Sequence, residues 1–298
     1  MAAVAVAGVA SAQVTITGAV SFGFAGDTTT AGIVNSGYGI DGSSLTFDAK
    51  EDLGGGLTVS TNFGMENFHE NGTVSGTKAS LTLAGGFCSV SMSSSEGGDF
   101  LPIDGLTANS NGTDADRITY TSPSINGFTL QVTTQDAIQG STFGNNGDGT
   151  ACTVNDGDCD GPSKAKTYAV NYTDGPLSVD AVFADFSSHA SIDKRTGVKA
   201  TYNLGIASVM YGQLTQTNIG TANNTESAVS VTVPMEALSL TVATAKSKTS
   251  GSAAKSGTAV TASYALSKRT SIAYYNEAYE STGASKVKEY SLLLKHTF

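Results

Sequence analysis

The sequence contains no tryptophan, only five prolines and few charged residues, which make up 14% of its 298 residues. Disorder requires dense charge and few apolar side chains, whereas 39% of this chain is hydrophobic, so a disordered protein is excluded. Apolar runs of about 18 to 20 residues are also lacking, which excludes a helical membrane protein. The net charge of −10 argues against nucleic acid or anionic lipid as the main partner.

Hydrophobic residues recur with a period of two, which predicts β-strands. In residues 14–24, Val14, Ile16, Val20, Phe22 and Phe24 share one face, and small or polar residues occupy the other. The same alternation predicts about sixteen strands, at 13–25, 43–51, 56–66, 78–84, 87–93, 117–122, 128–134, 165–173, 177–187, 194–202, 207–217, 227–233, 238–246, 257–264, 270–279 and 287–298. The chain is therefore expected to be all-β.

The connections between these strands alternate in length. Short links such as 52–55, 85–86 and 173–176 take every second place, and the stretches between them are longer and polar, at 26–42, 67–77, 94–116, 135–164, 188–193, 218–226, 247–256 and 280–286. An up-and-down barrel in a membrane sorts its loops in this way. Together with the alternation of apolar and small polar residues, this predicts a transmembrane antiparallel β-barrel over residues 13–298.

Residues 1–12 are small and apolar and end in Ala10-Ser11-Ala12, which has the form of a signal-peptidase site. We interpret them as the remnant of a signal peptide, which would direct the mature chain to an exported compartment. A short helix or an unstructured alanine-rich terminus is the alternative.

Several turn sequences resemble those of a known family. They are Glu51-Asp52-Leu53-Gly54-Gly55-Gly56, Arg117-Ile118-Thr119-Tyr120-Thr121-Ser122-Pro123, Gly127-Phe128, Asp174-Gly175-Pro176-Leu177, Leu266-Ser267-Lys268-Arg269-Thr270 and Lys295-His296-Thr297-Phe298. In order and spacing, the chain resembles the general porins of Gram-negative outer membranes, most closely the proteobacterial branch that contains anion-selective porins. The resemblance implies a sixteen-stranded homotrimeric pore for passive diffusion of small hydrophilic solutes and ions, whose third loop folds inward.

Alternation also predicts which side chains line the water-filled lumen. If Leu45 and Phe47 face lipid, their neighbours face the pore, and the same argument applies to later strands. The predicted wall residues are Ser44, Asp48, Lys50, Arg117 and Lys199. Placing such charges against lipid would cost roughly 2–4 kcal/mol each at mid-membrane. Some of them could instead solvate the rim of the barrel.

The third long stretch, 94–116, holds the predicted constriction. Its acidic residues Glu96, Asp99 and Asp104 surround an apolar clip, Phe100-Leu101-Pro102-Ile103, which could pin the loop against the wall. The resemblance implies that these carboxylates face Lys50, Arg117 and Lys199 across the pore. The alternative is an ordinary solvated acidic loop.

The sequence departs from its anion-selective relatives in one respect. The positions at which that branch has arginines can be counted from the first turn and along the fourth and fifth strands. This chain has Ser44, Asp48, Ser91 and Ser94 there, and we also expect these residues on the pore wall. With only three arginines in the chain, anion selectivity is not expected, and a modest cation preference or near-neutral selectivity is predicted.

One long loop combines two further motifs. Cys152 and Cys159 could form a disulfide in an oxidising compartment, leaving Cys88 as a free thiol. Between and beside them, Asp156, Asp158 and Asp160 have the spacing of the first ligands of a calcium loop, although Thr167 stands where an EF-hand has glutamate. A weak Ca²⁺ site or a solvated acidic loop both fit this pattern.

No catalytic motif is present, and none of the three histidines has a cysteine or a second histidine at the spacing of metal ligands. We therefore expect neither an enzyme nor a required cofactor. The last strand ends on Phe298, and it places Tyr290, Leu292, Leu294 and His296 on the same face. By resemblance, this terminus is a signal for the barrel-insertion machinery. A plugged barrel that acts as a substrate-specific channel, an adhesin or an enzyme remains the alternative function.

Overall fold

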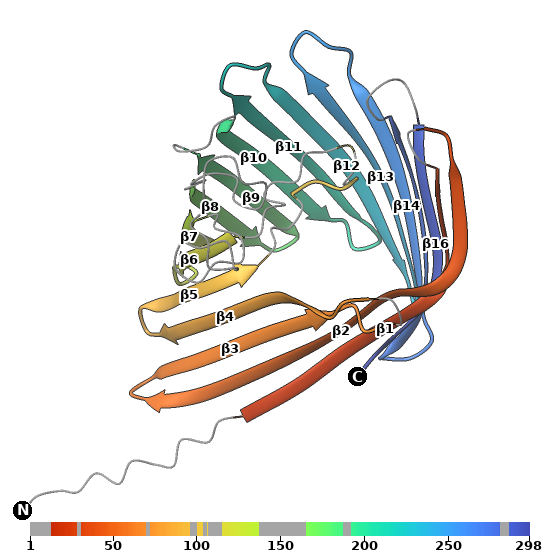
Figure 1. The fold of residues 1–298 in the computed structure, drawn as a ribbon. Helices are drawn as coiled ribbons and strands as arrows, with labels where there is room; N and C mark the ends of the chain where they lie inside the picture. The colour runs from red at the N-terminus through yellow and green to blue at the C-terminus, as the bar shows by residue number, and fades with distance from the viewer. Residues whose placement is uncertain are drawn as a thin grey trace, which may run out of the picture.

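The computed structural model describes residues 13–28, 31–69, 72–95, 100–103, 106, 115–136, 165–186, 192–280 and 286–298. These residues form a closed antiparallel barrel in which each strand pairs with its neighbours in sequence and β1 pairs with β16 (Figure 1). The strands are β1 (Gln13–Thr28), β2 (Val34–Gly54), β3 (Leu57–Glu66), β4 (Ser75–Gly85), β5 (Cys88–Ser95), β6 (Ala115–Thr121), β7 (Phe128–Asp136), β8 (Ala165–Asp174), β9 (Leu177–Asp185), β10 (Ile192–Asn203), β11 (Ser208–Asn218), β12 (Asn224–Met235), β13 (Leu238–Thr249), β14 (Lys255–Ala265), β15 (Thr270–Glu280) and β16 (Lys286–Thr297). Over the described ranges, no helix could cross a membrane.

All sixteen expected strands are confirmed, but the first hairpin differs from its prediction. The sequence predicts a long polar stretch at 26–42, whereas β2 already begins at Val34 and pairs with the end of β1. This part of β2 is rich in glycine and serine, and only Val34, Tyr38 and Ile40 carry the apolar alternation. The register shifts opposite Ser21 and Phe22, where Asp41 is the extra residue. A bulge of this kind adds a residue to one strand and restores the pairing beyond it.

The hairpin between β2 and β3 explains the glycine run in the first turn. Gly54, Gly55 and Gly56 all have positive φ, at 79°, 62° and 80°. Residues with a side chain rarely adopt this conformation, and glycine does so without steric cost. Asp52 fixes the start of the turn, because its carboxylate accepts a hydrogen bond from the backbone N–H of Gly54 at 2.9 Å.

Short turns gather at one end of the barrel, and the described ends of the chain lie there too (Figure 1). Gln13 pairs with Lys50 close to the β2–β3 turn, and Phe298 exchanges backbone hydrogen bonds with Gly18 of β1. We call this the short-turn end and the opposite one the long-loop end. The predicted alternation of connection lengths is therefore confirmed.

The outer face of the barrel is apolar. Exposed residues on alternate positions include Ile16, Phe22, Leu292 and Leu294. Aromatic side chains meet near both ends of this face, where Phe128 contacts Tyr172 at the short-turn end and Phe24 contacts Tyr290 at the long-loop end. Aromatic girdles that flank an apolar band are typical of barrels that span a membrane.

Candidate functional site

The inner face can be traced from strand to strand, because paired residues of adjacent antiparallel strands point to the same side of the sheet. One such row crosses five strands, from Asp48 through Asn62, Ser80 and Ser93 to Arg117. Leu81, Met92 and Ile118 occupy the alternate positions and are exposed on the outer face. The inner face is therefore polar, as expected for a wall that encloses water.

Loop three joins β5 to β6, and its described residues pack on the inner face of β10–β14. Leu101, Ile103 and Leu106 are buried to between 3% and 7% exposure. They form one cluster with Leu214 and a set of small wall residues, Ala228, Ala243, Ala245 and Ala259. The apolar clip expected from the sequence is thus confirmed as a contact that holds the loop inside the barrel.

Glycine makes room for the clip at its closest contacts with the wall. A Cβ at Gly197 would lie 2.8 Å from the ring of Phe100, and one at Gly212 would lie 2.5 Å from the side chain of Leu101. A larger residue at either position would collide with Phe100 or Leu101 unless the clip moved, because these two side chains already lie against β10 and β11. The wall under the loop is consequently shaped by the absence of side chains.

Lys199 lies directly beneath this loop. Its ammonium nitrogen is 5.0 Å from the centre of the Phe100 ring and 3.5 Å from a carboxylate oxygen of Asp180 on β9. The described part of loop three thus rests on Lys199, whereas the carboxylates that were expected to face Lys199 lie outside the described residues. Lys199 is an inner-wall residue, as predicted, but it belongs to the side of the wall on which the loop rests.

Arg195 occupies the same strand closer to the long-loop end. Its guanidinium donates a hydrogen bond to Gln216 at 2.6 Å and lies 5.2 Å from the centre of the Phe186 ring. These contacts hold its charge on the inner face of β10 and β11.

Four other predicted wall residues lie on the inner face. Asp48 accepts a hydrogen bond from Asn62 at 2.6 Å, and Arg117 donates one to Gln135 at 3.3 Å. Ser44 pairs with Ala19 and Ser91 receives a hydrogen bond from Thr82 at 2.9 Å.

Lys50 also points inward, because it shares the face of Asp48 and pairs with Ser60. It lies only four residues before Gly54 of the first turn and is exposed, so it belongs to the short-turn end of the lumen.

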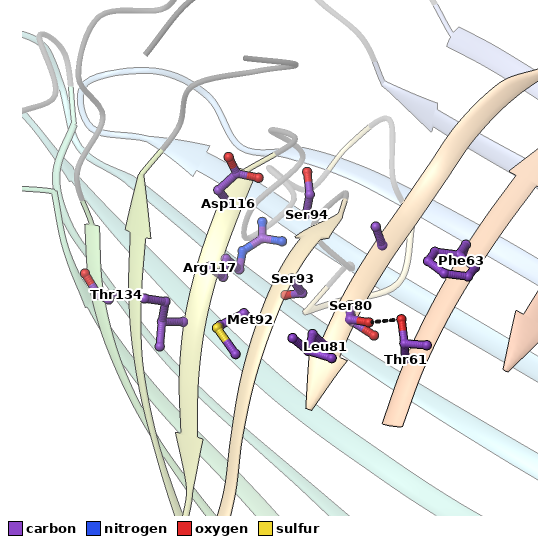
Figure 2. Close-up of a pocket in the computed structure, with 12 residues that line it drawn as sticks. Thr61, Phe63, Ser80, Leu81, Met92, Ser93, Ser94, Asp116, Arg117 and Thr134 are labelled. Carbon is purple, nitrogen blue, oxygen red and sulfur yellow. Dashed lines mark hydrogen bonds between the residues drawn. The ribbon is translucent and has the colours of Figure 1, made fainter. Parts of the chain in front are cut away.

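Ser94 is a correction. It pairs with Ala79 and Asp116 and shares the face of Met92, on the side opposite Ser91. Strand alternation makes this unavoidable, because positions 91 and 94 differ by an odd number of residues. Figure 2 shows Ser94 among the residues that line a depression of the wall together with Leu81 and Met92. The interpretation of Ser94 as a pore-wall residue is wrong.

Acidic residues on the inner face were missed by the sequence argument. Glu277 of β15 pairs with Glu289 of β16, which pairs in turn with Asp27 of β1. Tyr275 donates a hydrogen bond to Glu277, and Tyr279 donates one to Glu289 at 3.5 Å. Alternation within β15 and β16 predicts that Glu277 and Glu289 face the lumen. Their position next to Asp27 depends on the pairing of β16 with β1, which closes the barrel.

Eight predicted site residues lie outside the described residues. They are the loop-three carboxylates Glu96, Asp99 and Asp104, the two cysteines Cys152 and Cys159, and the calcium candidates Asp156, Asp158 and Asp160. Among the residues that the structure does describe, no group of three or more ligand side chains could hold a metal ion.

Cys88, by contrast, is described and is free. It adjoins the β4–β5 turn on the outer face, where its sulfur lies 3.0 Å from the hydroxyl of Tyr120. This places the thiol at the short-turn rim.

The terminal residue closes the barrel seam. The N–H of Phe298 donates to the carbonyl of Gly18 at 3.0 Å, and the N–H of Gly18 donates to Phe298 at 3.2 Å. The Phe298 ring covers Gly18 so closely that a Cβ there would lie 2.3 Å from it. An aromatic ring that covers a glycine on a neighbouring strand is a known device for pinning strand register.

A closed sixteen-stranded barrel with an apolar outer face, a polar lumen and a loop held inside is the architecture of an outer-membrane channel. The model of a family described as Gram-negative porin matches residues 1–284, so the chain belongs to this family. It is an outer-membrane diffusion channel and not an enzyme, and porins generally need no cofactor.

Solved porins share the fold at low sequence identity. An anion-selective porin from Comamonas acidovorans has a TM-score of 0.77 and 19% identity, over 97% of this chain and 100% of that chain. The OmpT loop-deletion mutant of Vibrio cholerae has a TM-score of 0.68 and 13% identity, over 96% and 99%. A Rh. blastica porin mutant has a TM-score of 0.66 and 13% identity, over 96% and 100%. Among curated proteins, none matches the sequence.

Proposed function

We propose that this porin has a modest cation preference or near-neutral selectivity for small hydrophilic solutes and ions. The observation that carries the proposal is the mixed charge of the described inner face. Its basic residues include Lys78, Arg117, Arg195 and Lys199, and its acidic residues include Asp27, Glu226, Glu277 and Glu289. A wall that carries both signs lacks the excess of positive charge that would enrich anions.

The loop-three carboxylates would tilt this balance toward cations. Asp99 directly precedes Phe100 and Asp104 directly follows Ile103, and both apolar residues are held on the inner wall. Chain connectivity therefore supports lumenal positions for Asp99 and Asp104, and Glu96 lies three residues further back. Charges in a narrow aqueous passage act over a screening length of about 8 Å at physiological ionic strength.

The test is the reversal potential of single channels in a KCl gradient. We expect K⁺ to be favoured slightly, with the preference declining as the salt concentration rises. Asp99→Asn combined with Asp104→Asn should shift the permeability ratio toward Cl⁻, whereas Asp52→Asn, in the turn at the short-turn end, should leave it nearly unchanged. Strong Cl⁻ selectivity of the native channel would refute the proposal.

We also propose a disulfide between Cys152 and Cys159 and a weak Ca²⁺ site at Asp156, Asp158 and Asp160. Thiol labelling followed by intact-mass measurement of the unreduced protein should find Cys88 alone reactive. Three labelled thiols would exclude the disulfide. Titration calorimetry that detects no heat with millimolar Ca²⁺ would exclude the metal site.

Assembly is the third part of the proposal: residues 1–12 are removed as a signal peptide, Phe298 is read by the insertion machinery, and the mature chain forms a homotrimer. The paired hydrogen bonds between Phe298 and Gly18 support a role for this residue in closing the seam. Deleting Phe298 should lower the yield of heat-resistant barrel in the outer membrane, while Thr297→Ser should not. Light scattering of the purified protein would identify a monomer if the trimer is wrong, and the mature N-terminus can be read by mass.

A further inference from the structure

Four lysines lie at the long-loop end of the outer face, on β13 and β16. They are Lys246, Lys248, Lys286 and Lys288, and all four are exposed. The chain as a whole is acidic, so a local concentration of positive charge on the lipid-facing side requires an explanation.

Contacts inside the barrel fix the direction in which these lysines point. On β13, Ala243 and Ala245 are buried in the cluster beneath the loop-three clip, so the alternate residues Lys246 and Lys248 face outward. On β16, Val287 is buried and pairs with Tyr279, which also packs against that cluster. Lys286 and Lys288, on either side of Val287, therefore face outward as well.

The lysines stand at the upper edge of the apolar band. Lys288 precedes Phe298 by ten residues along β16, and at roughly 3.3 Å per residue with a tilt of about 40° this spans about 25 Å. That distance matches the height of the lipid-facing band in such barrels. Leu292 and Leu294 occupy the band below it on the same face. The ammonium groups thus reach the level of the lipid headgroups.

Glu280 is the one carboxylate on this face among the described residues, and against four lysines it leaves a net positive charge. Within the described part of the chain, none of the four lysines forms an ion pair. Glu280 is paired in register with Lys286, but its carboxylate accepts hydrogen bonds from the N–H and the hydroxyl of Ser256, at 2.8 and 3.2 Å. Hydroxyl groups of Ser227 and Thr225 adjoin Lys246 and Lys248 on β12 and add further donors.

We propose that this face of β12–β16, the lysine face, binds the phosphate groups of lipid headgroups in the leaflet at the long-loop end. Ammonium and hydroxyl donors suit phosphate oxygens, and the apolar residues below them suit acyl chains. The two lysine pairs are separated by three strand spacings of about 4.8 Å each, so the face is wide enough for more than one phosphate. Binding would anchor the barrel at a fixed depth in the leaflet.

The experiment measures binding of phosphatidic acid to the refolded full chain by native mass spectrometry, with phosphatidylcholine as the zwitterionic comparison. Lys246→Gln with Lys248→Gln should weaken phosphatidic acid binding by about fivefold for each lysine removed. Adding Lys286→Gln and Lys288→Gln should weaken it further. Higher salt should reduce binding by the native chain more than by the fourfold variant.

A matched control removes the same charge from the other side of the wall. Lys255→Gln with Lys295→Gln changes two lysines of the inner face, which pair with Ser247 and Ser21. This variant should bind phosphatidic acid like the native chain, and equal loss of binding would overturn the proposal. Equally tight binding of phosphatidylcholine would do the same.

Two further outcomes identify other occupants. Displacement of the lipid by millimolar inorganic phosphate would identify a soluble anion as the ligand. A change of oligomeric state in the fourfold variant would identify a second copy of this chain. Either result would contradict the proposed lipid site. The site is supported if free phosphate does not displace the lipid and if the lysine variants bind the lipid more weakly.

Discussion

The inner faces of β10–β14 and of β2–β6 enclose the same lumen but are built from different residues. Beneath the loop-three clip, β10–β14 present glycine, alanine and one buried leucine, Leu214. Across the barrel, β2–β6 present a row of hydrogen-bonded polar side chains, including Asp48, Asn62 and Thr82. We call the inner face of β10–β14, which supports the loop, the dry wall. The inner face of β2–β6, which faces the solute, is the wet wall.

This difference shows how a barrel without a filled interior can still hold an ordered element inside. Removing side chains from the supporting wall lets the clip approach closely, and burying its apolar surface there stabilises it by about 25 cal/mol per Å². The polar wall gives no such stabilisation, because its donors and acceptors are already paired or hydrated. Loop three is therefore attracted to one side of the lumen only.

The largest expected effect comes from making the clip unsuited to the dry wall. Leu101 is 3% exposed, and Leu101→Asp would bury a carboxylate in an apolar cluster, in addition to losing packing of about 2–5 kcal/mol. The loop should leave the wall, and single-channel conductance should rise. Leu101→Met, which keeps volume and polarity, should conduct like the native channel. Unchanged conductance of Leu101→Asp would mean that the clip does not hold the loop.

A smaller effect is expected when the wall, and not the clip, is altered. Gly197→Val would place a Cβ within about 3 Å of the side chains of Phe100, Leu214 and Val182, which costs about 1–3 kcal/mol by overpacking. We expect noisier channels and a lower temperature for dissociation in detergent. Gly39→Val is the control, because a Cβ at Gly39 meets nothing within 4 Å. Equal effects of the two variants would contradict a wall shaped for the clip.

The smallest expected effect compares one positive charge on each side. Arg117 belongs to the wet wall, whereas Lys199 is covered by Phe100 and paired with Asp180 at 3.5 Å. Arg117→Gln should therefore shift the reversal potential toward K⁺ more than Lys199→Gln does. Both variants lose one positive charge, so the difference between their reversal potentials measures how far the loop and Asp180 shield Lys199. A larger shift for Lys199→Gln would place the ion path on the dry side.

Much of the barrel could be predicted from the sequence because its signals are local. The period of two, the glycine turn at Gly54–Gly56 and the sorting of loop lengths each need only a few neighbouring residues. The clip was recognisable as four apolar residues inside an acidic stretch. Alternation also assigns Ser94 and Ser91 to opposite faces, so the error at Ser94 was one of counting and not of missing information.

Features that depend on strand pairing required the tertiary structure. Residues 34–42 form a strand although most of them are glycine or polar, because β1 supplies hydrogen-bonding partners for all of them except the bulged Asp41. Lys199 lies beneath the described part of loop three, because the loop rests on a wall of small residues that β10–β14 form together.

Alternation along the chain is enough to predict one apolar and one polar face for each strand, and hence a wall that can enclose water within a membrane. Only the closed sheet decided which residues distant in sequence share a face, because register and closure are set by pairing around the whole barrel. Closure joins Asp27 to Glu277 and Glu289 inside the lumen. It also brings the lysines of β13 and β16 to one outer face, since the strands between them are only about 4.8 Å apart.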